Sequence, residues 1–285
     1  MNPEDRSNRV WFITGCSTGL GRVLAEEVLK SGGKVVATAR NVEQVADLER
    51  KFPASAKALP LDVTDFAQID RTVAAAIGHF GHIDVLVNNA GYGIAGAIEE
   101  VSEPESRTLF ETNVFGLLRV TQAVLPHLRQ RRSGHILNLS SVAGFVSTAG
   151  MGYYNATKFA VEGLSEALAA ELAPLGIHVT LIEPGPFRTD FLGRSGKLAA
   201  LRIPDYDATA GKARIYYVDQ VGKQKGDPLR AVEAMIKVVE SPNPPLRLLL
   251  GLNALQRVRA KIDNWQKEIA AWESVTIGAD FPEGE

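Results

Sequence analysis

The sequence is poor in the features that mark disulfide-linked, membrane-spanning and nucleic-acid-binding proteins. Its single cysteine among 285 residues, Cys16, cannot form an internal disulfide and suits a reducing compartment. No run reaches the roughly 18 uninterrupted apolar residues of a membrane span, and the polar residues 1–9 show no secretory signal. The formal net charge is −2, and like charges cluster only at residues 129–132, so nucleic acid is an unfavourable partner. We therefore expect a cytoplasmic protein without a membrane span or a nucleic-acid partner.

Metal-binding and thiol chemistry also find little support. No histidine lies near Cys16 in the sequence, so this residue is predicted to be a small buried side chain rather than a nucleophile. We predict no metal site.

The chain does contain a regular alternation of short apolar runs and amphipathic stretches. With 45% hydrophobic and 22% charged residues, 1–285 fits a single α/β domain with a full core. The expected strands are 10–13, 34–38, 56–61, 83–87, 135–139, 178–182 and 246–250. Most are joined through helical patterns, among them 42–51, about 66–80 and a long one over 110–128. This order predicts a Rossmann-type doubly wound parallel sheet of about seven strands with helices on both faces.

A glycine-rich loop follows the first expected strand. Gly15, Gly19 and Gly21 have the spacing G-x-x-x-G-x-G and lead into a helical pattern. Glycines let a backbone turn tightly and approach a pyrophosphate, and a helix start offers free N–H groups. The loop predicts a phosphate cradle, with an ordinary glycine-rich turn as the alternative.

The end of the second expected strand bears on the choice of cofactor. An NAD-binding chain usually has an acidic residue there to hold the ribose 2′-hydroxyl. This chain has Ala39 and Arg40 at that place, and the next acidic residue after them is Glu43. Arg40 can make a forked contact with a 2′-phosphate, which favours NADP. A solvated arginine at a helix start is the alternative.

The strongest catalytic pattern is Tyr154 followed by Lys158. Four residues place the two side chains one helical turn apart on the same face. A phenol has a pKa of about 10, and a neighbouring ammonium is expected to lower it, which would make Tyr154 a general acid/base near neutral pH. Ser141, at the end of an expected strand, can donate a hydrogen bond to a carbonyl oxygen beside that tyrosine. A chance pattern on a solvated helix is the alternative.

Two further segments have no place in the repeated strand–helix pattern. Residues 190–226 lack a clean period and hold apolar and tyrosine side chains among many charges. This indicates a partly helical substrate lid, with a disordered surface insert as the alternative. In the extension 252–285, apolar residues recur at intervals of three and four: Leu255, Val258, Ile262, Trp265, Ile269 and Trp272. We expect this helix to pack on the domain or over the substrate loops, with a subunit contact as the alternative.

Taken together, these motifs make the chain resemble the short-chain dehydrogenase/reductase family over nearly its whole length. The residues that carry the resemblance are Thr14 to Gly21, Asp62, Asn88 to Gly91, Asn113, Ser141, Tyr154, Lys158, Pro184, Gly185 and Thr189. Ser141 precedes Tyr154 by the usual family interval of thirteen residues, which selects it over Ser140.

The resemblance implies roles for these residues. Tyr154 would transfer a proton to or from the substrate oxygen, Ser141 would hydrogen-bond that oxygen, Lys158 would lower the tyrosine's pKa and hold the nicotinamide ribose, and Asn113 would keep a water in a proton relay. On residues alone, Asn113 also fits a helix-bending or buried polar position. The cofactor contacts implied are Gly15, Ser17, Thr18, Gly19, Leu20, Gly21, Arg40, Asp62, Val63, Asn89, Ala90, Gly91, Tyr154, Lys158, Pro184, Gly185 and Thr189.

The function expected is NADP(H)-dependent interconversion of an alcohol and a ketone or aldehyde. The lid and tail resemble those of members that act on lipophilic substrates. Thr18 is not the basic residue that some NADP-using members carry, so NAD(H) remains a weaker second cofactor. The family pattern also implies a homodimer or homotetramer. Two alternatives are a redox-sensing NADP-binding protein without turnover and, less favoured because of Arg40, an epimerase or dehydratase.

Overall fold

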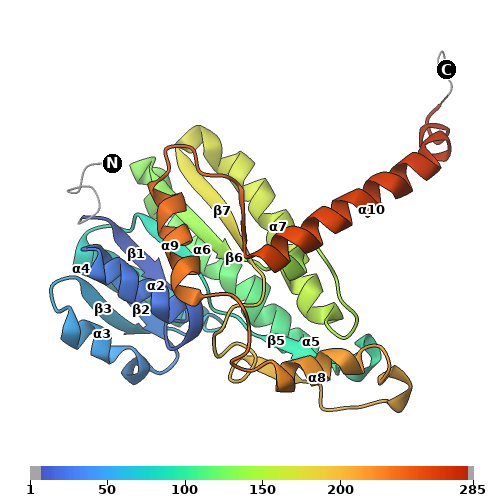
Figure 1. Cartoon of the computed structure of the whole chain (residues 1–285). Coiled ribbons are helices and arrows are strands. Elements are labelled where there is room, and N and C mark those ends of the chain that lie inside the picture. Colours follow the sequence, from blue (N-terminus) through green and yellow to red (C-terminus); the bar gives the residue numbers. More distant parts are fainter. Residues whose placement is uncertain (1–7, 282–285) are drawn as a thin grey trace.

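The computed structural model of the chain describes residues 8–281. Seven strands form one parallel sheet in the order β3-β2-β1-β4-β6-β7-β9 (Figure 1). The strands are β1 Val10–Ile13, β2 Lys34–Ala39, β3 Ala56–Pro60, β4 Val85–Asn88, β6 Gly134–Leu139, β7 Ile177–Pro184 and β9 Arg247–Leu250. The predicted Rossmann-type sheet is confirmed. Two segments lie outside the described residues. They are residues 1–7, where no secretory signal is expected, and residues 282–285 of the C-terminal extension.

Helices cover both faces of the sheet. They are α2 Gly19–Lys30, α3 Ala46–Lys51, α4 Phe66–Phe80, α5 Glu103–Phe110, α6 Leu117–Arg131, α7 Gly152–Leu172, α8 Gly211–Asp219, α9 Pro228–Glu240 and α10 Leu252–Ile277. Side chains of α2, α3 and α9 share one buried cluster with one face of the strands, whereas α4, α6 and α7 share another with the opposite face. Strands β1, β2, β4 and β6 are buried on both faces, which explains why they are largely continuous apolar runs in the sequence.

The register of the strands brings their carboxyl ends to one edge of the sheet. The Cys16 N–H donates to the Thr38 carbonyl at 2.8 Å, and the Thr14 N–H donates to the Val87 carbonyl at 3.0 Å. The loops after β1, β2 and β4 therefore leave the sheet close together, at the edge where ligands bind in open α/β sheets.

Three local features differ from the sequence-based expectation. A second, two-stranded sheet joins β5 Gly93–Ala95 to β8 Gly196–Leu198, too short to register as periodicity. The segment 42–51, expected as one helix, divides into a 3₁₀ turn (Val42–Gln44) and α3. The long helix expected around residue 113 is interrupted by a π-helical segment, Glu111–Gly116, between α5 and α6.

Helix α10 contradicts the expected packing of the tail on the domain. Its first turns contact the body through the buried Ala254 and Val258, which join a small cluster with Val142. From residue 259 to 281 every residue is exposed, and the helix projects away from the sheet (Figure 1). The periodicity was correct for a helix, but it carries no information about the direction in which that helix leaves the body. In the described part of the chain, no helix is long and apolar enough to cross a membrane.

Candidate active site

Tyr154 and Lys158 lie on α7 and are buried at the carboxyl edge of the sheet. The Lys158 Nζ atom lies 5.8 Å from the centre of the Tyr154 ring and donates to the Leu139 carbonyl, at the end of β6, at 2.6 Å. The helical spacing expected from the sequence thus places both side chains at one site. The main-chain contact of Lys158 ties α7 to β6.

Burial, rather than the neighbouring ammonium, dominates the pKa values of this pair. Burial raises the pKa of Tyr154 to about 12, against a smaller lowering by a side-chain hydrogen bond with Ser141. Burial lowers the pKa of Lys158 to about 8, with the charge of Glu162 acting in the opposite direction. The net shift of the Tyr154 pKa is therefore upward, so the expected lowering is wrong. The reason is that both groups leave water, which penalises their charged forms.

Ser141 lies beside the tyrosine at the end of β6. Its side chain caps a 3₁₀ turn, Val142–Gly144, by accepting the Ala143 N–H at 3.1 Å, and it donates to the Pro184 carbonyl at 3.4 Å. These contacts hold the hydroxyl next to the phenol. A carbonyl oxygen placed between them could accept two hydrogen bonds.

Asn113 is buried in the π-helical segment and makes three contacts. Its Oδ1 accepts the Tyr92 N–H at 3.0 Å, and its Nδ2 donates to the Tyr92 carbonyl at 2.9 Å and to the Thr157 Oγ1 at 3.2 Å. A Cβ on Gly91 would lie 3.0 Å from the Asn113 Oδ1 and 4.0 Å from the Lys158 Nζ. Asn113 therefore lies near the lysine and fixes the strand-end loop. A π-helical turn inside an α-helix often marks a functional position.

The glycine loop has the geometry of a phosphate cradle. Gly15 and Gly19 have φ angles of 71° and 64°, in the left-handed region that favours glycine. A Cβ on Gly21 would collide with the Asn89 side chain and lie 2.6 Å from the Gly15 carbonyl, so this position admits no larger residue. Thr18 begins α2 without a side-chain cap, which leaves N–H groups of the first turn to bind an anion.

Thr14 and Asn89 fasten this loop to the end of β4. The Asn89 Nδ2 donates to the Thr14 and Gly15 carbonyls at 2.8 and 2.9 Å. The Thr14 Oγ1 accepts the N–H groups of Asn89 and Ala90 at 2.9 and 3.0 Å. The cradle is thus rigid before any ligand binds, which lowers the entropic cost of binding.

The remaining expected cofactor contacts line the same edge. Arg40 is exposed and forms no hydrogen bond or ion pair with the described residues. Asp62 accepts from the N–H and hydroxyl of Thr64, and a Cβ on Gly19 would lie 3.8 Å from the Thr189 side chain. Ser17 and Leu20 are half-buried in the glycine loop, Val63 is buried, and Pro184 and Gly185 end β7. The glycine cradle and the free helix start together fit a dinucleotide.

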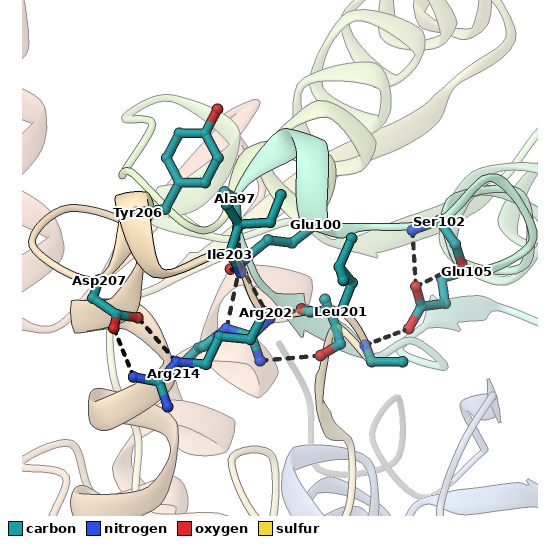
Figure 2. A network of polar contacts seen from close by, with 12 residues as sticks. Ala97, Glu100, Ser102, Glu105, Leu201, Arg202, Ile203, Tyr206, Asp207 and Arg214 are labelled. Carbon is teal, nitrogen blue, oxygen red and sulfur yellow. Dashed lines mark hydrogen bonds and ion pairs between the residues drawn. The ribbon is translucent and has the colours of Figure 1, made fainter.

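Residues 190–226 contain β8, the 3₁₀ turn Pro204–Tyr206 and α8. Figure 2 shows the polar contacts that hold them. The buried Glu100 accepts the Ile203 N–H at 2.8 Å and the Ala97 N–H at 2.7 Å, and pairs with Arg214 at 3.0 Å. Burial would raise the pKa of Glu100, but these hydrogen bonds and the Arg214 charge outweigh it and hold that pKa below its usual value. The sequence reasoning missed this clamp, because two adjacent glutamates in a loop, Glu99 and Glu100, have no distinguishing pattern.

Aromatic side chains from this segment lie close to Tyr154. The Phe191 and Tyr154 rings lie 5.8 Å apart between centres. Tyr217 of α8 is buried, and its hydroxyl finds no partner among residues 8–281. A Cβ on Gly93 would lie 2.5 Å from that hydroxyl. The Tyr217 hydroxyl therefore lies against Gly93, at the start of β5. Burial raises the pKa of Tyr217, and the charge of Tyr154 contributes to that rise.

A buried pair of carboxyl groups lies behind the site and was not expected. Glu162, one turn beyond Lys158 on α7, and Glu183 on β7 both contact the Arg247 Nε, at 3.1 and 3.5 Å. Burial raises the pKa of both, and the neighbouring charge of Glu162 contributes to raising that of Glu183 to about 8. One arginine thus serves two buried carboxyl groups as well as the exposed Glu166, which favours a proton remaining on the buried pair at neutral pH.

Comparison with known proteins agrees with this geometry. The family model described as short chain dehydrogenase matches residues 9–198. The chain belongs to the short-chain dehydrogenase family. Members of this family are oxidoreductases that act on CH–OH and carbonyl groups, and the predicted family membership and enzyme class are confirmed.

Curated relatives of this short-chain dehydrogenase cover most of its length. Oxidoreductase BOA17 of Botryotinia fuckeliana is 40% identical over 250 residues, which are 87% of this chain and 90% of that protein. The 3-ketodihydrosphingosine reductase of Bacteroides thetaiotaomicron is 35% identical (90% and 93% covered). Human retinol dehydrogenase 8 is 36% identical (84% and 80% covered).

Solved structures of similar proteins extend the comparison to cofactors. A short-chain dehydrogenase from Streptomyces avermitilis has a TM-score of 0.89 and 42% identity, covering 96% of this chain and 99% of that one. A Burkholderia phymatum family member in complex with NAD has a TM-score of 0.81 and 26% identity (91% and 95% covered). A serine dehydrogenase complexed with NADP+ has a TM-score of 0.73 and 30% identity (85% and 94% covered). Such neighbours bind nicotinamide cofactors of both kinds.

Proposed function

We propose that this short-chain dehydrogenase interconverts a lipophilic ketone or aldehyde and its alcohol with NADP(H), and that Tyr154 is the general acid/base. The observation that carries the proposal is the assembly of Ser141, Tyr154 and Lys158 at the sheet edge beside the glycine cradle. When bound, the cofactor would supply or accept the hydride. The protein's own residues orient the reacting groups and manage the proton.

The chemical roles follow from contacts on each side chain. The hydroxyl of Ser141 and the phenol of Tyr154 would together hold the substrate oxygen. Because burial raises the pKa of Tyr154 to about 12, the phenol carries its proton at neutral pH and is ready to donate it to a carbonyl oxygen as charge develops there. The Lys158 ammonium would then stabilise the phenolate that remains. Asn113 positions the Tyr92 backbone at the wall of the site.

Arg40 supports a preference for NADP(H). Its guanidinium is exposed and unpaired within the described residues, at the end of β2 where an NAD-binding chain would have an acid. Two parallel hydrogen bonds from the Arg40 guanidinium to a 2′-phosphate would offset the negative charge of that phosphate. Ser17, Thr18 and the N-terminus of α2 would bind the pyrophosphate, and Asp62 with Val63 would lie by the adenine. NAD(H) would bind more weakly, because it lacks the phosphate.

The expected lid, residues 190–226, supports a lipophilic substrate. Phe191 faces the Tyr154 ring, and Leu192 and Met151 pack with Tyr217 in a small apolar cluster. Ketodihydrosphingosine and retinol, named in two relatives, are both compounds with long hydrocarbon portions. The buried Tyr217 hydroxyl is the one unpaired polar group in this cluster, among the described side chains, that could orient a substrate.

We also infer that the protein acts in the cytoplasm as a homodimer or homotetramer. Large apolar side chains on the π-helical segment and α7 are exposed in the single chain, namely Phe115, Phe159 and Leu164. Pairing through this face would cover them.

The test is consumption of NADPH, with NADH in parallel, against carbonyl compounds graded from small and polar to large and lipophilic. We expect turnover with bulky apolar carbonyls and a much lower kcat/KM with NADH. Preferred use of NADH would refute the role of Arg40. Tight NADPH binding without turnover of any carbonyl would refute the enzymatic proposal and favour a redox-sensing protein.

A further inference from the structure

Helix α10 exposes an apolar stripe that nothing in residues 8–281 covers. Beyond Val258, the side chains of Ile262, Trp265, Ile269 and Trp272 recur at intervals of four, three, four and three, so they follow one line along the helix. Trp265 is 55% exposed and Trp272 is 64% exposed. Two indole rings in water on a projecting helix mark a contact surface, because exposed apolar residues of this size normally gather only where something binds.

The helix also lacks the packing that ordinarily stabilises one. Helices in proteins gain most of their stability from tertiary contacts, and isolated helices are marginal in water. From residue 259 to its end at Ile277, α10 has no buried residue. A partner that covers the stripe would provide the missing contacts.

The charges on α10 are distributed unequally along its length. Residues 252–264 carry Arg257, Arg259 and Lys261 against Asp263. Residues 265–277 carry Glu268 and Glu273 against Lys267. The half nearer the body is therefore basic and the outer half acidic. Two copies of this helix running in opposite directions place unlike halves against each other.

We propose that α10 is a dimerisation arm that pairs antiparallel with α10 of a second copy of this chain. With Ile262 and Ile269 at the a positions of the heptad, and Trp265 and Trp272 at the d positions, an antiparallel pair sets each isoleucine opposite a tryptophan. Each of these layers of the helix pair then contains one isoleucine and one tryptophan, so the side-chain volume is the same in all of them. A parallel pair would instead set tryptophan on tryptophan and isoleucine on isoleucine.

The flanking charges distinguish the two directions. In the antiparallel pair Arg259 of one helix meets Glu273 of the other, twice by symmetry, and only Glu268 faces its own copy near the two-fold axis. In a parallel pair Glu268 would face Glu273 twice, with no compensating unlike pair along the stripe. The antiparallel direction also keeps the two bodies at opposite ends of a helix pair about 39 Å long, since α10 has 26 residues.

This arm is separate from the face of α7 that carries Phe159 and Leu164, and its test does not depend on catalysis. The molar mass in solution would be measured by light scattering for the full chain and for the double variant Trp265→Glu/Ile269→Glu. We expect the variant's mass to be half that of the wild type, with NADPH binding unchanged. The matched control is Ala271→Glu, on the opposite side of the same helix, which should leave the mass unchanged.

Charge variants test the direction of pairing. Glu273→Arg alone should weaken association about tenfold, because it sets like charges together twice, and adding Arg259→Glu should restore it. Glu268→Gln should tighten association. An unchanged mass for Trp265→Glu/Ile269→Glu would overturn the proposal. So would wild-type monomers that sediment with phosphatidylcholine–phosphatidylglycerol vesicles only when the stripe is intact, since the stripe would then bind lipid.

Discussion

Tyr154 and Lys158 are both enclosed, and burial moves their pKa values in opposite directions, to about 12 and about 8. The tyrosine therefore keeps its proton across the physiological range. The lysine, in contrast, loses its charge as the pH rises through about 8, a pH at which enzymes are ordinarily assayed. At the residue scale, the lysine is thus the group whose titration should be visible in the reaction.

We predict that kcat/KM for carbonyl reduction falls as the pH rises through about 8. Above this pH Lys158 is neutral and no longer stabilises the phenolate left by proton donation. The measurement is a profile of kcat/KM from pH 6 to 10 at saturating NADPH. A profile that stays level to pH 10 would show that Lys158 does not control the step.

Arg40→Ala should change the choice of cofactor. Hydrogen bonds to charged groups contribute about 1.5–3 kcal/mol, so the KM for NADPH should rise about 10- to 150-fold while that for NADH stays constant. Steady-state kinetics with both cofactors measures the effect. Arg50→Ala, an exposed arginine on α3, is the matched control. An equal loss with both cofactors would mean that Arg40 does not read the 2′-phosphate.

At the scale of elements, the clamp around Glu100 ties residues 199–214 to the 3₁₀ turn Ile98–Glu100. Removing this carboxylate leaves the largely buried Arg214 guanidinium unpaired, which costs about 3 kcal/mol or more. Glu100→Ala should therefore lower the melting temperature by roughly 6 °C or more and raise the substrate KM. Scanning calorimetry and steady-state kinetics would measure the two effects.

The neighbouring Glu99 provides the control for this experiment. Its side chain is exposed and bonds only the Tyr206 hydroxyl among the described groups. Glu99→Ala should change the melting temperature little. Equal effects of the two variants would show that the clamp does not position the lid.

An element could be predicted from the sequence where burial in the core gives it a regular apolar pattern. The strand Val10–Ile13 and the helix Phe66–Phe80 have apolar patterns set by the core, and both were predicted at their observed bounds. The π-helical turn at Asn113 and the strands β5 and β8 depend on tertiary contacts, such as the Asn113–Tyr92 pair, that leave no local period. The direction of α10 depends on where its first turn attaches, which periodicity does not encode.

The candidate site shows the same division. Gly15, Gly21, Tyr154 and Lys158 could be placed from spacing, because helix and turn geometry fix their separation. Their pKa values could not, since these depend on burial by distant parts of the chain. Glu100 and the Glu162–Glu183 pair were missed for the same reason.

At the scale of the whole molecule, the Glu162–Glu183 pair links stability to pH. In the folded protein the pKa of Glu183 is about 8, above its ordinary value, so the folded state retains a proton that the unfolded chain releases. Stability from this group is complete below the unfolded pKa and declines as the pH rises towards 8. The carboxyl pair should therefore destabilise the protein as conditions become alkaline.

Glu183→Gln should remove much of this dependence. Urea unfolding at pH 5 and pH 8 would measure the change in unfolding free energy, which should be smaller in the variant than in the wild type. Glu166→Gln is the control, because that exposed carboxylate also contacts Arg247. If the unfolding free energy changed equally between pH 5 and pH 8 in Glu183→Gln and in the wild type, Glu183 would not be the group that links stability to pH.

The most direct measurement compares Tyr154→Phe with its neighbour Tyr153→Phe. Turnover of the best carbonyl substrate and NADPH binding would be recorded on the same samples. Tyr154→Phe should lose about 10²- to 10⁴-fold in kcat with NADPH binding intact, whereas Tyr153→Phe should keep most of its activity. A Tyr154→Phe enzyme that retains most of the wild-type turnover would contradict the assignment of Tyr154 as the general acid/base.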